Sequence, residues 1–164
     1  MQSLTSRPMT EKDKQEICAW KYPGEYAIYN LPSYEKMRER KIGFLNPETE
    51  NNYLAFLDGE RLVGFVNILE EDTEVFIGLG VAPDCCGRHY GRKILAAAGE
   101  ISRERYPEKP MYLEVRTWNT RAVRCYEKAG FRIEGEPYEL TTGMGEGTFY
   151  RMTKDLINLA DILG

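Results

Sequence analysis

The stretch from Thr73 to Phe131 constrains the fold most strongly, because its residue pattern changes several times within one short span. Thr73 to Val81 is apolar and rich in Val, Ile, Phe and Leu, which predicts a buried strand. A glycine-bearing turn follows, and Gly91 to Tyr106 then has helical spacing until Pro107 ends it. Met111 to Thr117 alternates again and predicts a second strand. A strand, a crossover helix and a strand of this length indicate two parallel strands with a right-handed connection.

The turn between the first strand and the helix has the features of an anion site. Backbone N–H groups at a helix start are unpaired and lie at the positive end of the helix dipole, where they bind phosphate. Gly87 and Gly91 lack a Cβ and allow close approach of a ligand. Arg88 and Arg92 can add charge-assisted bonds. The same pattern also fits a turn whose glycines only relieve strain.

The residues after the turn resemble the GCN5-related N-acetyltransferases. The likeness rests on the run from Tyr112 to Asn119 (YLEVRTWN), on Ala122, and on Tyr126 to Phe131 (YEKAGF). It is closest to the branch that acetylates the N-terminal alanine of a ribosomal protein. The resemblance implies a single α/β domain over residues 1–164. That domain has a mixed, mostly antiparallel sheet, two central splayed parallel strands and flanking helices.

For the co-substrate, the resemblance implies that the turn holds the pyrophosphate of acetyl-CoA while strand backbone pairs with its pantetheine arm. The turn departs from the family pattern twice, because Cys86 stands where Arg or Gln is usual and His89 stands where the first glycine is usual. Backbone donors do not depend on side chains, but His89 would have to adopt a positive φ if the glycine is needed for one. The expected cofactor contacts are Leu79, Gly80, Val81, Cys86, Gly87, Arg88, His89, Tyr90, Gly91, Arg92 and Asn119.

The implied reaction is direct transfer of an acetyl group to a primary amine. An amine must be neutral to attack a thioester, so a base or a water chain has to remove a proton, and a proton donor helps the thiolate to leave. Through the resemblance, Glu114 is predicted as the base and Tyr126 as the donor. The plainer interpretations are a surface pair of Glu114 with Arg116 and a core tyrosine. Glu74 on the preceding strand is an alternative base. Asn119 fits an N-cap as well as a cofactor contact.

The acceptor amine is expected among tyrosines outside these motifs. Tyr22, Tyr26 and Tyr29 lie in an aromatic segment without clear periodicity, and Tyr138 lies in the last predicted hairpin. Family members commonly build the acceptor wall from these regions, whereas an apolar loop over the core is the plainer interpretation. The acceptor is a small-molecule or peptide amine, and its identity stays open among peptide N-termini, lysine, polyamines, amino sugars and antibiotics.

The remaining chain predicts short elements on both sides of this region. Two of them are hairpins, one with Asp58-Gly59 as its turn and one with a glycine-rich loop. The expected elements are a strand Leu4 to Pro8, a helix from the cap Thr10 to Ala19, a helix from Ser33 to about Lys41, a hairpin of Tyr53 to Leu57 with Leu62 to Leu69, a helix after Asn119, a hairpin of Arg132 to Leu140 with Thr148 to Met152 around Gly143, Gly145 and Gly147, and a tail from Lys154 to Gly164.

Composition excludes several classes of function. The net charge is −4 and no long basic run occurs, which argues against nucleic-acid binding. No apolar run is long enough to span a membrane, and the first residues lack the apolar core of a signal peptide. The cysteines, Cys18, Cys85, Cys86 and Cys125, have no metal spacing, which predicts reduced thiols in a cytoplasmic protein without a metal. We expect a monomer or a homodimer.

Two other functions stay open from the sequence. A CoA-binding regulatory module that has lost catalysis would explain the two departures in the turn. Cys86 with His89 resembles the thiol–imidazole pair of a hydrolase, although no third group to orient the pair is evident.

Overall fold

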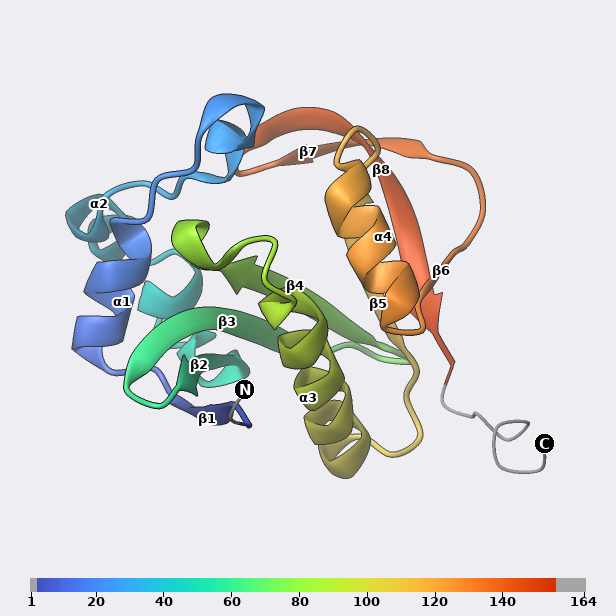
Figure 1. Ribbon diagram of the computed structural model, residues 1–164, viewed down its shortest axis with the longest axis horizontal. Helices are drawn as coiled ribbons and strands as arrows, with labels where there is room; N and C mark the ends of the chain where they lie inside the picture. Colours follow the sequence, from blue (N-terminus) through green and yellow to red (C-terminus); the bar gives the residue numbers. More distant parts are fainter. Residues whose placement is uncertain (1–2, 156–164) are drawn as a thin grey trace. The chain divides into compact units, whose positions relative to one another are not determined.

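The computed structural model describes residues 3–155 (Figure 1). The chain forms two compact units. The first unit comprises the described part of Met1–Asn67 together with Leu79–Ile94, and the second comprises Ile68–Gly78 with the described part of Leu95–Gly164. Strands β3 (Arg61–Glu70) and β4 (Val75–Val81) and helix α3 (Tyr90–Arg105) each contribute residues to both units.

The first unit begins with a strand and a capped helix. The Thr10 side chain accepts a hydrogen bond from the N–H of Asp13, whose carboxylate accepts one from the N–H of Thr10, and this capping box starts the helix. Arg7 pairs with Asp13 at 2.9 Å and ties the strand to the helix. The elements are β1 (Thr5–Pro8), α1 (Glu11–Cys18), a 3₁₀ helix (Gly24–Tyr29), α2 (Tyr34–Arg40), two 3₁₀ turns (Gly43–Leu45 and Glu50–Asn52), β2 (Tyr53–Asp58), and a 3₁₀ turn (Pro83–Cys85).

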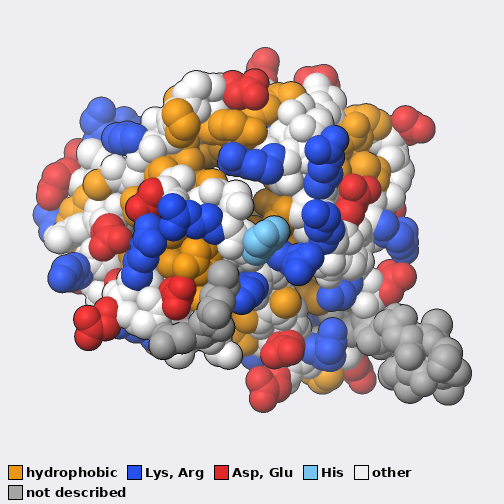
Figure 2. Space-filling view, in the orientation of Figure 1, with side chains coloured by type: hydrophobic (Ala, Val, Ile, Leu, Met, Phe, Trp, Pro, Cys, Tyr) orange, Lys and Arg blue, Asp and Glu red, His pale blue; other side chains and the backbone are white. Residues whose placement is uncertain are grey.

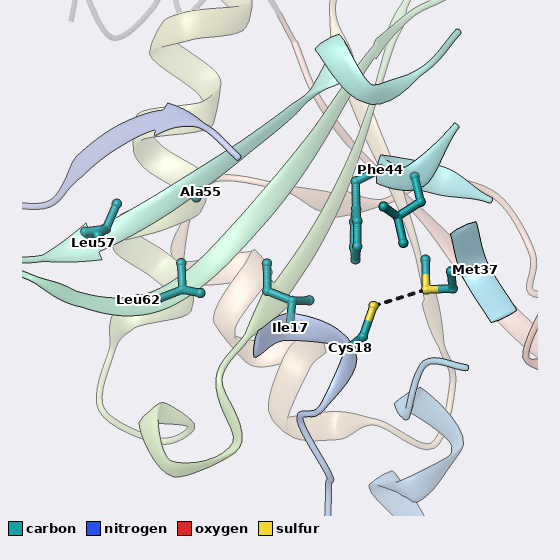
Figure 3. Packing of buried hydrophobic residues seen from close by; sticks show 8 residues of the cluster. Ile17, Cys18, Met37, Phe44, Ala55, Leu57 and Leu62 are labelled. Atoms are coloured by element: carbon teal, nitrogen blue, oxygen red, sulfur yellow. Dashed lines mark hydrogen bonds between the residues drawn. The ribbon is translucent and has the colours of Figure 1, made fainter. Parts of the chain in front are cut away.

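The core of the first unit lies between α1, α2 and strands β2 and β3 (Figure 3). Ile17 and Cys18 from α1 are buried with Leu57 and Leu62 from the hairpin strands. The Cys18 Sγ lies 3.5 Å from the Sδ of Met37 in α2. Burial raises the pKa of the Cys18 thiol to about 11, so this thiol stays protonated at neutral pH.

The second unit is built around β5 and the long strand that pairs with it. Asn119 caps the helix after β5, because its Oδ1 accepts a hydrogen bond from the N–H of Ala122 at 3.2 Å. At the other end of that helix, the Lys154 Nζ donates to the carbonyl of Ala129 at 3.0 Å. The elements are β5 (Met111–Arg116), α4 (Thr120–Lys128), β6 (Arg132–Ile133), β7 (Tyr138–Thr142) and β8 (Gly145–Lys154).

The strands belong to one sheet in the order β1-β2-β3-β4-β5-β8-β6, with β7 also paired to β8. The described pairings of β1 with β2, of β2 with β3, and of β8 with β5, β6 and β7 are antiparallel. The pairing of β4 with β5 is parallel and covers only Val75↔Met111 and Phe76↔Tyr112 within the described residues. The expected mixed, mostly antiparallel sheet with a splayed parallel pair is therefore confirmed.

Three expected boundaries are wrong. The strand predicted from Arg132 to Leu140 is two strands, because Gly135 has a φ of +77° and Pro137 lies two residues after it. Strand β8 begins at Gly145 rather than Thr148, so two of the three loop glycines lie in the strand. Strand β4 begins at Val75, since a hydrogen bond from the N–H of Glu71 to the carbonyl of Glu74 closes a turn. Most of the expected tail lies outside the described residues.

The expected hairpin with Asp58-Gly59 is confirmed, and Gly59 has the positive φ of +64° that such a turn requires. The aromatic segment after Trp20, expected to be irregular, contains the 3₁₀ helix Gly24–Tyr29. No helix among residues 3–155 combines the length and the apolar character that crossing a membrane requires.

Candidate active site

The turn between β4 and α3 contains two residues with left-handed backbone. Gly87 has a φ of +80° and His89 a φ of +68°. A Cβ built on Gly87 would meet no atom within 4 Å, so there is room for a side chain. Glycine is favoured at this position because of its positive φ. Histidine is among the side chains that adopt this conformation more readily than most. His89 therefore keeps the positive φ that a glycine would supply at this position.

This turn exposes backbone donors in the first unit. Helix α3 begins at Tyr90, so the N–H groups of Tyr90, Gly91 and Arg92 have no acceptor within the helix. The side chains of Arg88 and Arg92 are exposed. The imidazole of His89 is exposed as well, and Figure 2 shows the histidine side chain at the surface. Unpaired donors with nearby guanidinium groups are suited to a phosphate group.

The turn is anchored to the hairpin of β2 and β3. The Tyr90 hydroxyl donates to Asp58 Oδ2 at 2.6 Å, and Arg61 pairs with Asp84 at 2.6 Å. Upstream of the turn, the N–H of Ala82 donates to a carbonyl of β3 at 2.8 Å. The buried Tyr90 ring thus has a structural role, and only its backbone N–H is available for the predicted cofactor contact.

Close packing explains the glycine in the predicted cofactor strand. A Cβ on Gly80 would overlap the ring of Phe65. A Cβ on Gly64 would lie 2.6 Å from the carbonyl oxygen of Gly80 and 2.5 Å from Ile94 Cδ1. Gly80 is therefore required by its neighbours in the first unit, independently of any ligand.

Tyr22 contacts the predicted cofactor strand. Its hydroxyl donates to the carbonyl of Val81 at 2.6 Å, and its N–H donates to Asn30 Oδ1 at 2.7 Å. Burial, followed by the nearby Cys86 thiol, raises the pKa of Tyr22 well above its ordinary value, so the hydroxyl stays a donor. Tyr26 and Tyr29 are half-buried in the 3₁₀ helix between these two anchors.

Cys86 lies beside the same carbonyls. Its Sγ is 3.5 Å from the carbonyl oxygen of Ala82 and 3.9 Å from that of Val81. Among residues 3–155, no group of three His, Cys, Asp or Glu side chains is placed to hold a metal ion.

In the second unit, the structure brings together two residues that the sequence assigned to different roles. The Tyr138 hydroxyl in β7 donates to Glu114 Oε2 in β5 at 2.6 Å. Burial and then the bond to Glu114 raise the pKa of Tyr138 far above its ordinary value. The Tyr138 hydroxyl is therefore protonated at neutral pH and can act as the donor of this bond.

Glu74 has a different environment from Glu114. Arg151 donates to Glu74 through both terminal nitrogens, one of them at 3.3 Å, and through Nε to Glu134 at 2.9 Å. The same guanidinium lies 4.1 Å from the centroid of the Tyr112 ring. The bond to Glu74 holds the pKa of Arg151 above its ordinary value. Arg151 is directly opposite Glu114 in the β5–β8 register, yet its guanidinium binds these two other carboxylates.

The alternative interpretation, a surface pair of Glu114 with Arg116, is wrong. Arg116 is 4% exposed and donates to the backbone carbonyls of Gly145 and Glu146. Its guanidinium carbon lies 4.8 Å from the centroid of the Phe149 ring. The sequence analysis did not predict the contact of Arg116 with these carbonyls. Gly147 was the residue that could have indicated it, because a Cβ at that position would overlap the Arg116 guanidinium.

Tyr126 and Asn119 lie on α4 or at its start. Tyr126 is half-buried, and its carbonyl accepts hydrogen bonds from the N–H groups of Ala129 and Phe131. Asn119 is buried and forms the N-cap, which confirms one of its two expected roles. Its cofactor contact, like the proton donation assigned to Tyr126, stays a prediction.

The backbone of His89 leads to a first prediction. We expect His89→Val to lower the free energy of unfolding by about 1–2 kcal/mol, because a β-branched residue is strained at a positive φ. The variant should also bind CoA more weakly, since the turn would relax. Chemical denaturation and CoA titration measure the two effects. His89→Asn is the matched control, because asparagine tolerates this φ. Equal stability of the valine and asparagine variants would contradict the prediction.

Comparison with known proteins identifies similar chains. The model of the acetyltransferase (GNAT) family matches residues 14–131. A curated N-alpha-acetyltransferase of Sulfurisphaera tokodaii is 26% identical over 110 residues. That match covers 63% of this chain and 66% of the relative, which is just under two thirds of its length.

Solved structures of the same fold include polyamine acetyltransferases. A spermidine N-acetyltransferase SpeG chimera (K23-Q34) from Vibrio cholerae and hSSAT has a TM-score of 0.76 and 21% identity, and the match covers 99% of both chains. Spermidine N-acetyltransferase from Vibrio cholerae, solved in complex with CoA and spermine, has a TM-score of 0.73 and 22% identity. That match covers 92% of this chain and 94% of the other. These similarities confirm the expected fold.

Proposed function

We propose a reaction for this chain on one premise, namely that it belongs to the acetyltransferase (GNAT) family. Family membership confirms the expected class, an acyl-CoA-dependent acetyltransferase with acetyl-CoA as its co-substrate. In the proposed reaction, the acetyl group passes directly from the thioester to a primary amine. No acyl-enzyme intermediate on Cys86 is required.

The observation that carries the proposal is the environment of Glu114. Within the described residues no cation pairs with its carboxylate, and the arginine opposite it is bound to Glu74 and Glu134. The Tyr138 hydroxyl contacts one carboxylate oxygen at 2.6 Å. A carboxylate without an ion-pair partner can accept a proton from an incoming ammonium group. We therefore assign the base to Glu114 in preference to Glu74, and the proton donor to Tyr126.

The turn after β4 is assigned to the acetyl-CoA pyrophosphate. Its support is the positive φ of Gly87 and His89 and the N–H groups from Tyr90 to Arg92, which have no acceptor within α3. Retention of this backbone, despite the two departures from the family pattern, favours an active enzyme over a regulatory module that has lost catalysis. The backbone from Leu79 to Val81 is assigned to the pantetheine arm.

The proposed acceptor is the N-terminal amine of a peptide. The motif from Tyr112 to Asn119 supports this choice, as does the similarity to an N-alpha-acetyltransferase. A polyamine is the second candidate, favoured by the similarity to spermidine N-acetyltransferases. The net charge of −4 also favours a cationic acceptor.

Thiol release from acetyl-CoA tests both candidates in one assay. The acceptors are a peptide with a free N-terminal alanine, the same peptide with that amine blocked but a lysine retained, and spermidine. We expect release with the free peptide and background release with the blocked one. Faster release with spermidine would move the assignment to polyamines. CoA binding without release on any amine would support the regulatory module, and absence of CoA binding would refute the family-based proposal altogether.

A further inference from the structure

Arg116 is a buried cation that no carboxylate neutralises within residues 3–155. Its side chain is 4% exposed, and its hydrogen bonds go to neutral groups. Nη1 donates to the carbonyl of Glu146 at 3.1 Å and Nη2 to that of Gly145 at 3.4 Å. Burial of a charge is costly unless hydrogen bonds compensate, so both carbonyls are needed where they lie.

The surroundings of Arg116 are shaped to hold its guanidinium. A Cβ on Gly147 would overlap Nη1, so only glycine leaves room there. The Phe149 ring, 4.8 Å from the guanidinium carbon, adds a cation–π contact. Arg116 is opposite Phe149 across β5 and β8, and Phe149 is opposite Tyr138 across β8 and β7. The three side chains therefore form one row across three strands, on one face of the sheet.

The bond between Tyr138 and Glu114 depends on that row. In the described sheet β7 pairs with β8 and not with β5, so the bond has to cross from β7 over β8. A small tilt of the β7–β8 hairpin would separate the two oxygens, which lie 2.6 Å apart. The carbonyls that Arg116 binds are those of the first two residues of β8, next to the hairpin turn.

We propose that Arg116 is a positioning residue that fixes the β7–β8 hairpin against β5 and so keeps the Tyr138 hydroxyl on Glu114. The inference rests on the proposed function, because it takes Glu114 as the base. The fork geometry of arginine explains why this residue type serves here, since one planar group reaches two neighbouring carbonyls. Lysine would keep the charge but lose the planar fork that places two donors side by side.

The kinetic test compares Arg116→Met, Arg116→Lys and Tyr138→Phe. We expect Arg116→Met to lower kcat/KM for the acceptor by about 10- to 100-fold, because a displaced contact near the reacting groups is costly. The affinity for CoA should be unchanged, and Arg116→Lys should recover part of the loss. Arg103→Met, at an exposed arginine of α3, is the matched control and should retain full activity.

Double variants separate positioning from general loss of stability. If Arg116 acts through Tyr138, the Arg116→Met and Tyr138→Phe losses will not multiply in the double variant. Gly147→Ala should reproduce the defect by displacing the guanidinium, and it should add nothing in the Arg116→Met background. It also keeps the test informative if Arg116→Met fails to fold. Multiplying losses would overturn the inference, as would Gly147→Ala with wild-type kinetics.

Amide hydrogen exchange gives a readout that needs no turnover. We expect faster exchange in residues 138–149 of Arg116→Lys and Gly147→Ala, with unchanged exchange in β1 and β2. Unchanged exchange in the hairpin would refute the anchoring. If the wild type transferred no acetyl group to any amine, the proposed function would fail, while the exchange data would still decide whether Arg116 holds the hairpin.

Discussion

Tyr126→Phe is expected to lower kcat by about 10²- to 10⁴-fold, the usual contribution of a general acid or base. The change removes only the hydroxyl of a half-buried residue in α4 and keeps its ring. Folding and CoA affinity should therefore persist. Without the hydroxyl, the CoA thiolate has to leave without a proton from the protein, so the transfer step becomes slow.

Single-turnover measurements should show the loss directly, because the hydroxyl acts in the chemical step rather than in product release. Tyr106→Phe, just after the end of α3, is the matched control and should behave as wild type. Full turnover of Tyr126→Phe would assign the proton donor to water. Loss of CoA binding in the variant would assign Tyr126 a structural role instead.

Local patterns made much of the fold predictable. The apolar strand, the glycine turn and the helix after it follow from residues close in sequence, and so does the Asp58-Gly59 hairpin. Asn119 was identified as a possible N-cap because capping depends on the next three residues only. The positive φ of His89 could also be anticipated from the sequence, because it depends on one residue in one turn.

The contacts that define the site could not be predicted in the same way, because they join residues far apart in the chain. Tyr138 and Glu114 are 24 positions apart and meet only through the registers of β5, β8 and β7. Arg151 and Glu74 are 77 positions apart. A one-residue shift of β8 would turn every side chain of that strand to the other face, so these contacts depend on a register that is set jointly by several strands and turns.

The same limitation explains the wrong start of β8 in the last hairpin. Three glycines within five residues indicate a loop, and a loop was predicted there. Gly147 is instead a strand residue whose missing side chain makes room for Arg116 from β5. The reason for this glycine lies in another strand, which local analysis of the hairpin does not include.

Glu114→Gln is expected to lower kcat/KM for the acceptor by about 10²- to 10⁴-fold and to remove the base-dependent acidic limb of its pH profile. A base acts only when it is deprotonated, so kcat/KM of the wild type falls as the pH falls and the carboxylate takes up a proton. Glutamine keeps the shape of the side chain and can still accept the Tyr138 hydroxyl, but it does not titrate. The limb should therefore disappear while the fold is kept.

The acceptor amine produces an acidic limb of its own, because only its neutral form attacks the thioester. Profiles measured with two amines of different basicity separate the two groups, since only the amine limb moves with the acceptor. Glu74→Gln is the matched control. The Glu74→Gln change weakens the ion pair with Arg151 and should lower thermal stability. It should leave kcat/KM unchanged and keep the acidic limb that the base produces in the pH profile. If Glu114→Gln is silent and Glu74→Gln loses the limb, the base lies just before β4, and the ion pair with Arg151 must open during the reaction.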